Sequence, residues 1–236
     1  MKVIGIDPAP KKETTIYNAE GWLTVEAHKL PDYVAKIAES DGGHLVCWDA
    51  PLTSGKAGMD GCYYNRPIER FLRKLVPEGI SVLAYAGCPH WAVTRAAVGL
   101  PRVGRFDCTD LPFTLCAEGR APENNGNLIV EVHPAVAIWF WCLESGQTKW
   151  KYKTDHEVRE HLWHTMAGAL GEFKPNRDPK DDDEFDAYVA YLLGSMWLAN
   201  SGVILLGRAD TGSFLVPAVD GFAQAFAQYC EPSPPG

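Results

Sequence analysis

Acidic residues stand at the ends of three short apolar segments of the sequence and at the start of a long amphipathic one. They are Asp7, Asp49, Glu131, Asp182, Asp183 and Asp186. Carboxylates at the carboxyl ends of neighbouring parallel strands, opposite a helix that also carries carboxylates, form a site for a hard divalent cation. The pattern therefore predicts binding of Mg²⁺ or Mn²⁺ and metal-assisted phosphoryl chemistry.

The acidic run at 181–184 has a second explanation. Acidic side chains near the N-terminus of a helix stabilise it through the helix dipole, so this effect accounts for most of the run without a metal. Asp186 lies inside the predicted helix, where capping no longer explains it. Asp182 is four residues before Asp186, and both flank the apolar stripe of the helix. The expected metal ligands are Asp7, Asp49, Asp182, Asp183 and Asp186, with the choice between Asp182 and Asp183 left open.

Structural roles are the alternative for the carboxylates at the strand ends. Asp7 precedes a proline and could cap a turn, and Asp49 could do the same. Glu131 could pair with Lys149 or Arg159. Ligands nevertheless bind at the carboxyl ends of strands in open α/β sheets. The expected catalytic residues are therefore Asp7, Asp49, Glu131, Asp183 and Asp186.

The net charge of the chain is −8, and its basic residues occur in local clusters. A protein that tracks a long duplex usually carries a basic stripe instead. The expected partner is therefore a nucleotide, a small phosphate ester, or a short or structured nucleic acid. Arg66, Arg70 and Lys151 are the candidates for contact with a substrate phosphate. A solvated helix face is the alternative for the two arginines.

Short β-branched runs and apolar periodicity predict a mixed α/β protein. The expected strands cover 3–7, 14–19, 22–28, 45–49 and 128–132, with two late strands at 203–206 and 214–216. The expected helices cover 31–40, 67–75, 134–144, 154–170, 182–200 and 218–229, with short helical stretches at 91–98 and 111–118. These elements predict one domain at 1–230, an insertion at about 54–127 and a disordered tail at 231–236.

The composition predicts a cytoplasmic protein without a membrane segment. The first expected strand begins at residue 3, which leaves no room for a signal peptide. The apolar run at 135–143 is too short to span a bilayer. The seven cysteines are irregularly spaced and include no CxxC pair, so reduced thiols are expected and a zinc site is not. The oligomeric state is not predictable from these features.

Four short motifs occur in a characteristic order along the chain. They are Gly5-Ile6-Asp7, then Trp48-Asp49-Ala50-Pro51-Leu52, then Glu131-Val132-His133-Pro134, and then Asp182-Asp183-Glu184-Phe185-Asp186-Ala187. Together they resemble the DUF429 family, often described as predicted RNase H-like nucleases, over roughly residues 1–220. The resemblance implies an RNase H-like fold with a five-stranded sheet in the order 3-2-1-4-5, flanked by helices. RNase H-like resolvases carry an i, i+3 acidic pair on the corresponding helix, which would select Asp183 with Asp186.

The expected function is that of a divalent-metal-dependent phosphodiesterase or nuclease. One alternative is an actin-like or sugar-kinase-like nucleotide-binding phosphotransferase. The segment 7–15 contains two prolines and no glycine, which argues against a phosphate loop built from backbone amides. The other alternative is a non-catalytic interaction protein on the same fold.

Overall fold

The structure is a computed structural model of the whole chain. It describes residues 1–52, 66–78, 80, 82, 94, 97–98, 113–119, 126–168, 170–208 and 210–230. Much of the expected insertion at 54–127, most of the expected helix at 91–98 and the expected tail at 231–236 lie outside these residues.

A mixed six-stranded sheet forms the centre of the molecule, in the order β3-β2-β1-β4-β6-β5. Its strands are β1 (Lys2–Asp7), β2 (Thr14–Asn18), β3 (Gly21–Val25), β4 (His44–Trp48), β5 (Thr114–Cys116) and β6 (Leu128–Glu131). Strands β1, β2 and β3 pair antiparallel, whereas β4 runs parallel to both β1 and β6, and β5 runs parallel to β6. The carboxyl ends of β1, β4 and β6 therefore lie along one edge of the sheet.

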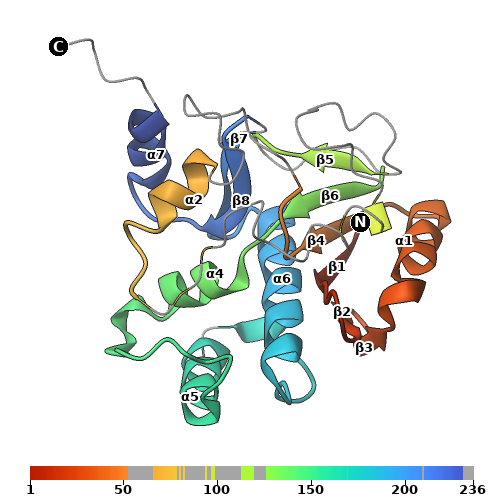
Figure 1. Cartoon of the computed structure of the whole chain (residues 1–236), viewed down its shortest axis with the longest axis horizontal. Coiled ribbons are helices and arrows are strands. Elements are labelled where there is room, and N and C mark those ends of the chain that lie inside the picture. The colour runs from red at the N-terminus through yellow and green to blue at the C-terminus, as the bar shows by residue number, and fades with distance from the viewer. Residues whose placement is uncertain are drawn as a thin grey trace.

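Helices cover both faces of this sheet, and Figure 1 shows α6 crossing one face while α1 lies on the opposite side. The helices are α1 (Leu30–Glu39), α2 (Pro67–Leu72), α4 (Pro134–Trp141), α5 (His156–Ala167), α6 (Asp182–Leu198) and α7 (Phe222–Cys230). The described residues also form the 3₁₀ turns η1 (Ala27–Lys29), η3 (Leu143–Ser145) and η4 (Gly171–Phe173). In the described part of the chain, no helix combines the length and the apolar character needed to cross a bilayer.

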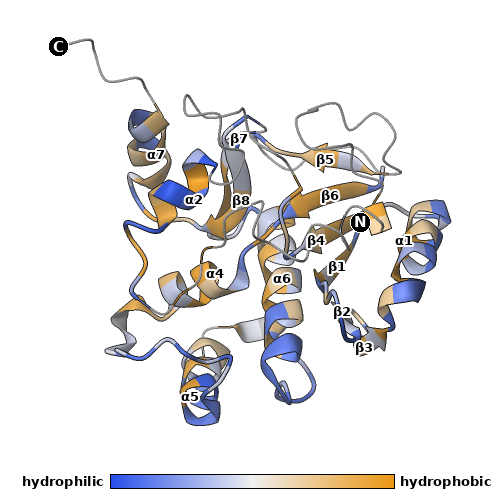
Figure 2. Ribbon diagram, in the orientation of Figure 1, coloured by the Kyte–Doolittle hydropathy of each residue, from blue (hydrophilic) through white to orange (hydrophobic). Residues whose placement is uncertain are grey.

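The alternation of side chains along β4 divides the core into two layers. Leu45 and Cys47 pack with α4, α5 and α6, whereas Val46 and Trp48 pack with α1. All five residues of β4 are buried, as expected for a parallel strand covered on both faces. Figure 2 shows the resulting apolar centre and the polar N-terminal end of α6.

Two predictions about the sheet are wrong. The sheet has six strands and not five, and the segment 111–118 contains β5 and no helix in its described residues. The backbone N–H of Thr114 donates to the carbonyl of Asn127 at 2.8 Å, and β5 continues alongside β6 from there. A short apolar run is compatible with a helix or a strand, and here pairing with β6 stabilises the strand.

A separate hairpin lies beside the end of the main sheet. It consists of β7 (Val203–Arg208) and β8 (Gly212–Pro217), which pair antiparallel, and β8 is buried throughout. A single parallel bridge joins Val132, just after β6, to Leu215 of β8. The hairpin thereby closes the side of the region where the strands of the main sheet end.

Candidate functional site

Asp7, Asp49 and Asp186 come together at the edge where the parallel strands end. Asp7 is the last residue of β1, and Asp49 follows β4 directly. The backbone N–H of Asp49 donates to the carbonyl of Ile6 at 3.0 Å, which continues the pairing of the two strands. Asp186 lies one turn inside α6, which packs against β1.

Gly5 allows this close approach of helix and strand. A Cβ atom on Gly5 would lie 2.1 Å from the carbonyl oxygen of Ala187 and 2.4 Å from the backbone nitrogen of Tyr191. A larger residue would therefore collide with the backbone of α6. The glycine that begins the first motif thus brings Asp186 towards Asp7.

The three carboxylates influence one another strongly. Burial raises the pKa of Asp7 well above its ordinary value, and Asp186 and Asp49 raise it further. Burial, followed by Asp186, raises the pKa of Asp49 to about 8. Among the described residues, no hydrogen-bond donor contacts the carboxylate of Asp7 or Asp49. The surroundings of the cluster thus disfavour the ionised forms of Asp7 and Asp49 in the absence of a cation.

Lys153 and Tyr152 provide the partners of Asp186. The Nζ atom of Lys153 lies 2.6 Å from Oδ2 of Asp186, and the hydroxyl of Tyr152 donates to Oδ1 at 2.6 Å. The pKa of Lys153 is raised above its ordinary value, mainly by Asp186 and to a smaller extent by Asp49 and Asp7. Burial, followed by Asp186, raises the pKa of Tyr152. Lys153 is therefore a counter-cation for the whole cluster.

A cavity of about 410 Å³ opens beside these carboxylates. The described residues that line it include Asp7, Asp49, Glu131, Trp150, Lys151, Lys153 and Phe214. Acidic groups, lysines and aromatic rings thus share one space, whose volume suits a small ligand or one unit of a polymer.

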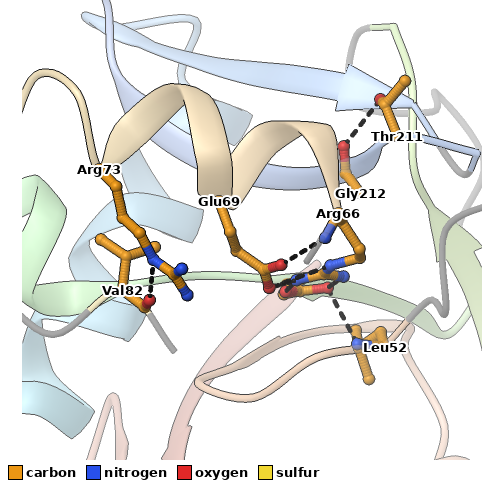
Figure 3. Close-up of polar contacts among 8 residues, drawn as sticks. Leu52, Arg66, Glu69, Arg73, Val82, Thr211 and Gly212 are labelled. Atoms are coloured by element: carbon orange, nitrogen blue, oxygen red, sulfur yellow. Dashed lines mark hydrogen bonds and ion pairs between the residues drawn. The ribbon is translucent and has the colours of Figure 1, made fainter. Parts of the chain in front are cut away.

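Glu131 and Arg66 belong to a buried network beside the cavity. Figure 3 shows Arg66 of this network with Glu69 and Leu52. Arg66 donates to both oxygens of Glu131, at 2.8 and 2.5 Å, and also to Glu69. The backbone N–H of Leu52 donates to Glu131 at 2.9 Å. Burial raises the pKa of Glu131 to about 7, although Arg66 acts in the opposite direction. Burial would lower the pKa of Arg66, but Glu131 and Glu69 raise it well above its usual value, so the guanidinium stays charged.

The candidates for contact with phosphate occupy three different environments. Arg66 is 2% exposed and already paired with two carboxylates, although it lines the cavity. Arg70 is exposed on α2 and is not among the described residues of the cavity wall. Lys151 is exposed and lines the cavity. Lys151 is thus the candidate that the geometry leaves available to a ligand.

Asp182 and Asp183 lie in the first turn of α6, and like Asp186 they are not among the described residues that line the cavity. Asp181 caps the helix by accepting from the backbone N–H of Glu184 at 2.9 Å. Asp183 forms an ion pair with Lys12 and contributes to the raised pKa of Asp7. The pKa of Asp182 is raised, mainly by burial. Asp186 is therefore the residue of this helix that the structure joins to Asp7 and Asp49.

The carboxylates of Asp7, Asp49 and Asp186 are suitable ligands for a hard cation, but in their present positions they do not form a metal-binding group. Over the described residues, no three or more Asp, Glu, His or Cys side chains are gathered closely enough to bind a metal ion. Lys153 and Tyr152 already contact both oxygens of Asp186. Three carboxylates, two of which have raised pKa values, are the oxygen ligands that Mg²⁺ and Mn²⁺ prefer. A metal at this site would therefore require Lys153 to withdraw.

The sequence pattern identified the three central carboxylates. It did not identify Tyr152 and Lys153 as the partners of Asp186, or Glu69 as a partner of Arg66. A signal for Glu69 was present in the sequence. Pro67 begins the helix and Glu69 is its third residue, a position at which an acidic side chain often binds the N-cap residue. No local signal connects the segment 149–154 with α6, because the two are more than 25 residues apart in the chain.

The fold and this cavity define a mixed α/β protein with an acidic site at the ends of its parallel strands. The family model described as "Protein of unknown function (DUF429)" matches residues 5–211, and the chain belongs to this family. The match includes all four short motifs that contain the acidic residues of the site. No curated protein and no solved structure matched the chain in the same comparisons.

Proposed function

We propose that the protein is a divalent-metal-dependent phosphodiester hydrolase with an RNase H-like fold, acting on nucleic acid or on a small phosphate ester. The observation that carries the proposal is the convergence of Asp7 and Asp49, which line the cavity, with Asp186, which lies next to them on α6. The antiparallel strands β1 to β3, followed by the parallel strands β4 and β6, support the choice of fold.

Asp7, Asp49 and Asp186 are the residues that would hold Mg²⁺ or Mn²⁺. Such an ion, when bound, supplies positive charge that stabilises the phosphoryl oxygens during displacement. The raised pKa values of Asp7 and Asp49 support this assignment, because they result from burial and from repulsion between the carboxylates, and a divalent cation would stabilise the ionised forms against both effects.

The other residues of the cavity indicate how a substrate would bind and how large it can be. Lys151 and Lys153 face the cavity and can pair with the negative charge of a phosphodiester. The aromatic side chains of Trp150 and Phe214 line the same space and give it an apolar wall. A cavity of about 410 Å³ favours a single nucleotide unit at the site over a duplex lying inside it.

The test is a cleavage assay with the full chain and its Asp7→Asn variant. Single-stranded, duplex and branched DNA and RNA are incubated with Mg²⁺, with Mn²⁺ or with a chelator. Asp41→Asn, the same chemical change at an exposed position, is the matched control. We expect metal-dependent cleavage by the wild type and by Asp41→Asn, and its loss in Asp7→Asn. Absence of cleavage, or equal cleavage by all three proteins, would remove the proposal. Turnover of ATP in the same buffers would then favour the phosphotransferase alternative.

A further inference from the structure

We propose that Lys153 and a divalent cation are alternative partners of Asp186, so that a metal binds beside Asp186 only when Lys153 releases this carboxylate. The inference rests on the proposed function and adds a device that controls the same site. It assigns to Lys153 two positions, one in the resting protein and one in the metal-bound protein.

The geometry at Asp186 gives the first step. Its Oδ1 accepts the hydroxyl of Tyr152 at 2.6 Å, and its Oδ2 lies 2.6 Å from Nζ of Lys153. Asp186 itself is 1% exposed, so its carboxylate is covered by neighbouring groups. A metal ion binds a carboxylate oxygen at about 2.0–2.6 Å. An ion at Oδ2 would therefore occupy the space in which the ammonium group of Lys153 now lies.

The two partners of Asp186 differ in their freedom to move. Tyr152 is 3% exposed, and its ring packs edge-on against Phe185 with 5.7 Å between the ring centroids. The side chain of Lys153 is 53% exposed and sits in the turn that precedes α5. Its four-carbon stem can swing outwards without disturbing the core. Lys153 is thus the partner that a cation can displace, while Tyr152 keeps Asp186 in place.

The displaced ammonium group would not be lost to the site. Lys153 lines the cavity together with Lys151, two residues earlier in the chain. Once the metal neutralises the carboxylates, Lys153 is free to pair with a phosphate at the mouth of the cavity. Metal binding and the recruitment of a substrate anion are thereby coupled through one side chain.

Binding of the metal itself provides the test, without reference to catalysis. Mg²⁺, Mn²⁺ and Ca²⁺ are titrated calorimetrically into the wild type, Lys153→Met, Lys153→Gln and Lys151→Met. Lys151→Met is the matched control, because it removes the same charge from the same cavity but from a residue without a contact to Asp186 in the described structure. We expect both Lys153 variants to bind each ion about tenfold more tightly than the wild type. Lys151→Met is expected to change affinity by no more than about twofold, because its charge is more distant and is screened.

Thermal melting gives a second readout that does not depend on the heat of binding. Without metal, Lys153→Met leaves the carboxylates uncompensated, and its Tm falls below that of Lys151→Met. Saturating Mg²⁺ then raises the Tm of Lys153→Met by more than that of the wild type. If the wild type binds metal and the Lys153 variants bind it no more tightly than Lys151→Met, the inference fails and the metal site stands. If no protein binds metal at millimolar concentration, the proposed function fails as well. Binding confined to the Lys153 variants would support the displacement directly.

Discussion

Arg66 and Glu131 form a two-pronged ion pair in the interior of the protein, with side chains that are 1% and 2% exposed. Glu131 ends β6 and also accepts the backbone N–H of Leu52, three residues beyond Asp49. Arg66 is the N-cap residue of α2 and also forms an ion pair with Glu69. The pair therefore connects the chain after β4, the end of β6 and the start of α2. Its position indicates that it fixes the backbone beside Asp49.

Replacement of Arg66 is predicted to affect stability before it affects binding. Arg66→Met leaves two buried carboxylates without their partner, which costs about 3–5 kcal/mol and lowers the Tm by about 10 °C in a domain of this size. Arg70→Met, an exposed position on the same helix, is predicted to change stability by less than about 0.5 kcal/mol. Chemical denaturation of both variants measures the difference. Equal stability, combined with loss of phosphate binding in Arg66→Met, would restore the role expected for Arg66 from the sequence.

Asp7 and Asp186 are predicted to respond in opposite directions to the same substitution. Asp7→Asn removes a carboxylate whose ionisation is unfavourable, and we expect a rise in Tm of about 2–4 °C in a chelating buffer. Asp186→Asn weakens the contacts with Lys153 and Tyr152, which costs about 1–3 kcal/mol and lowers the Tm. Scanning fluorimetry without metal distinguishes the two. A fall in Tm for Asp7→Asn would mean that its carboxylate is a structural partner.

The stability of the metal-free protein is predicted to decrease between about pH 5 and pH 8 on account of Asp49. Its pKa is raised to about 8 in the folded state, chiefly by burial and then by Asp186, whereas in the unfolded chain it is about 3.9. Between these values the folded state holds a proton that the unfolded state has released. The stabilisation is therefore complete below the unfolded pKa and is lost as the pH rises through the folded pKa.

The measurement is the Tm of Asp49→Asn relative to that of the wild type at a series of pH values. The amide does not titrate, so the advantage of the variant should grow by at least about 3 °C from pH 5 to pH 9. Asp41→Asn, at an exposed position, should give a difference that is independent of pH. A constant difference for Asp49→Asn would show that its carboxyl group is ionised throughout this range.

The sequence was informative wherever one segment alone determines the structure. The apolar runs that end in Asp7 and Asp49 are strands, and the stripe of Phe185, Val189 and Leu192 is the buried face of α6. Burial on both faces requires such runs, so their composition is sufficient evidence. Asp186 was separable from the capping residues because it lies beyond the first turn of the helix.

Contacts between distant segments could not be predicted in the same way. The pairing of β5 with β6 makes a strand of a run that is equally compatible with a helix. The partners of Asp186 come from a turn more than 30 residues earlier in the chain, with no periodicity to mark Tyr152 or Lys153. Arg66 was expected to contact a substrate phosphate, whereas in the structure it is buried in an ion pair with Glu131. An arginine that follows a polar loop gives no local sign of such a distant partner.

The last prediction concerns Gly5, which controls the distance between β1 and α6. In Gly5→Ala, the added Cβ would lie 2.1 Å from the carbonyl oxygen of Ala187, and backbone atoms cannot rotate away as a side chain can. The helix must therefore shift, and overpacking of this kind costs about 1–3 kcal/mol or more. We expect the Tm to fall by about 5–10 °C. Gly168→Ala is the control, because its Cβ would meet no atom closer than 3.8 Å.

The same substitution tests whether Asp7 and Asp186 act together. A shift of α6 away from β1 moves Asp186 from Asp7 without changing any charge. We therefore expect Gly5→Ala, at a temperature where it remains folded, to lose metal affinity by about tenfold or more, whereas Gly168→Ala retains it. Circular dichroism of the same samples confirms that the helices are intact. Unchanged affinity in a folded Gly5→Ala protein would mean that an ion is held without joint ligation by β1 and α6, and the site would have to be sought along β4 and β1 alone.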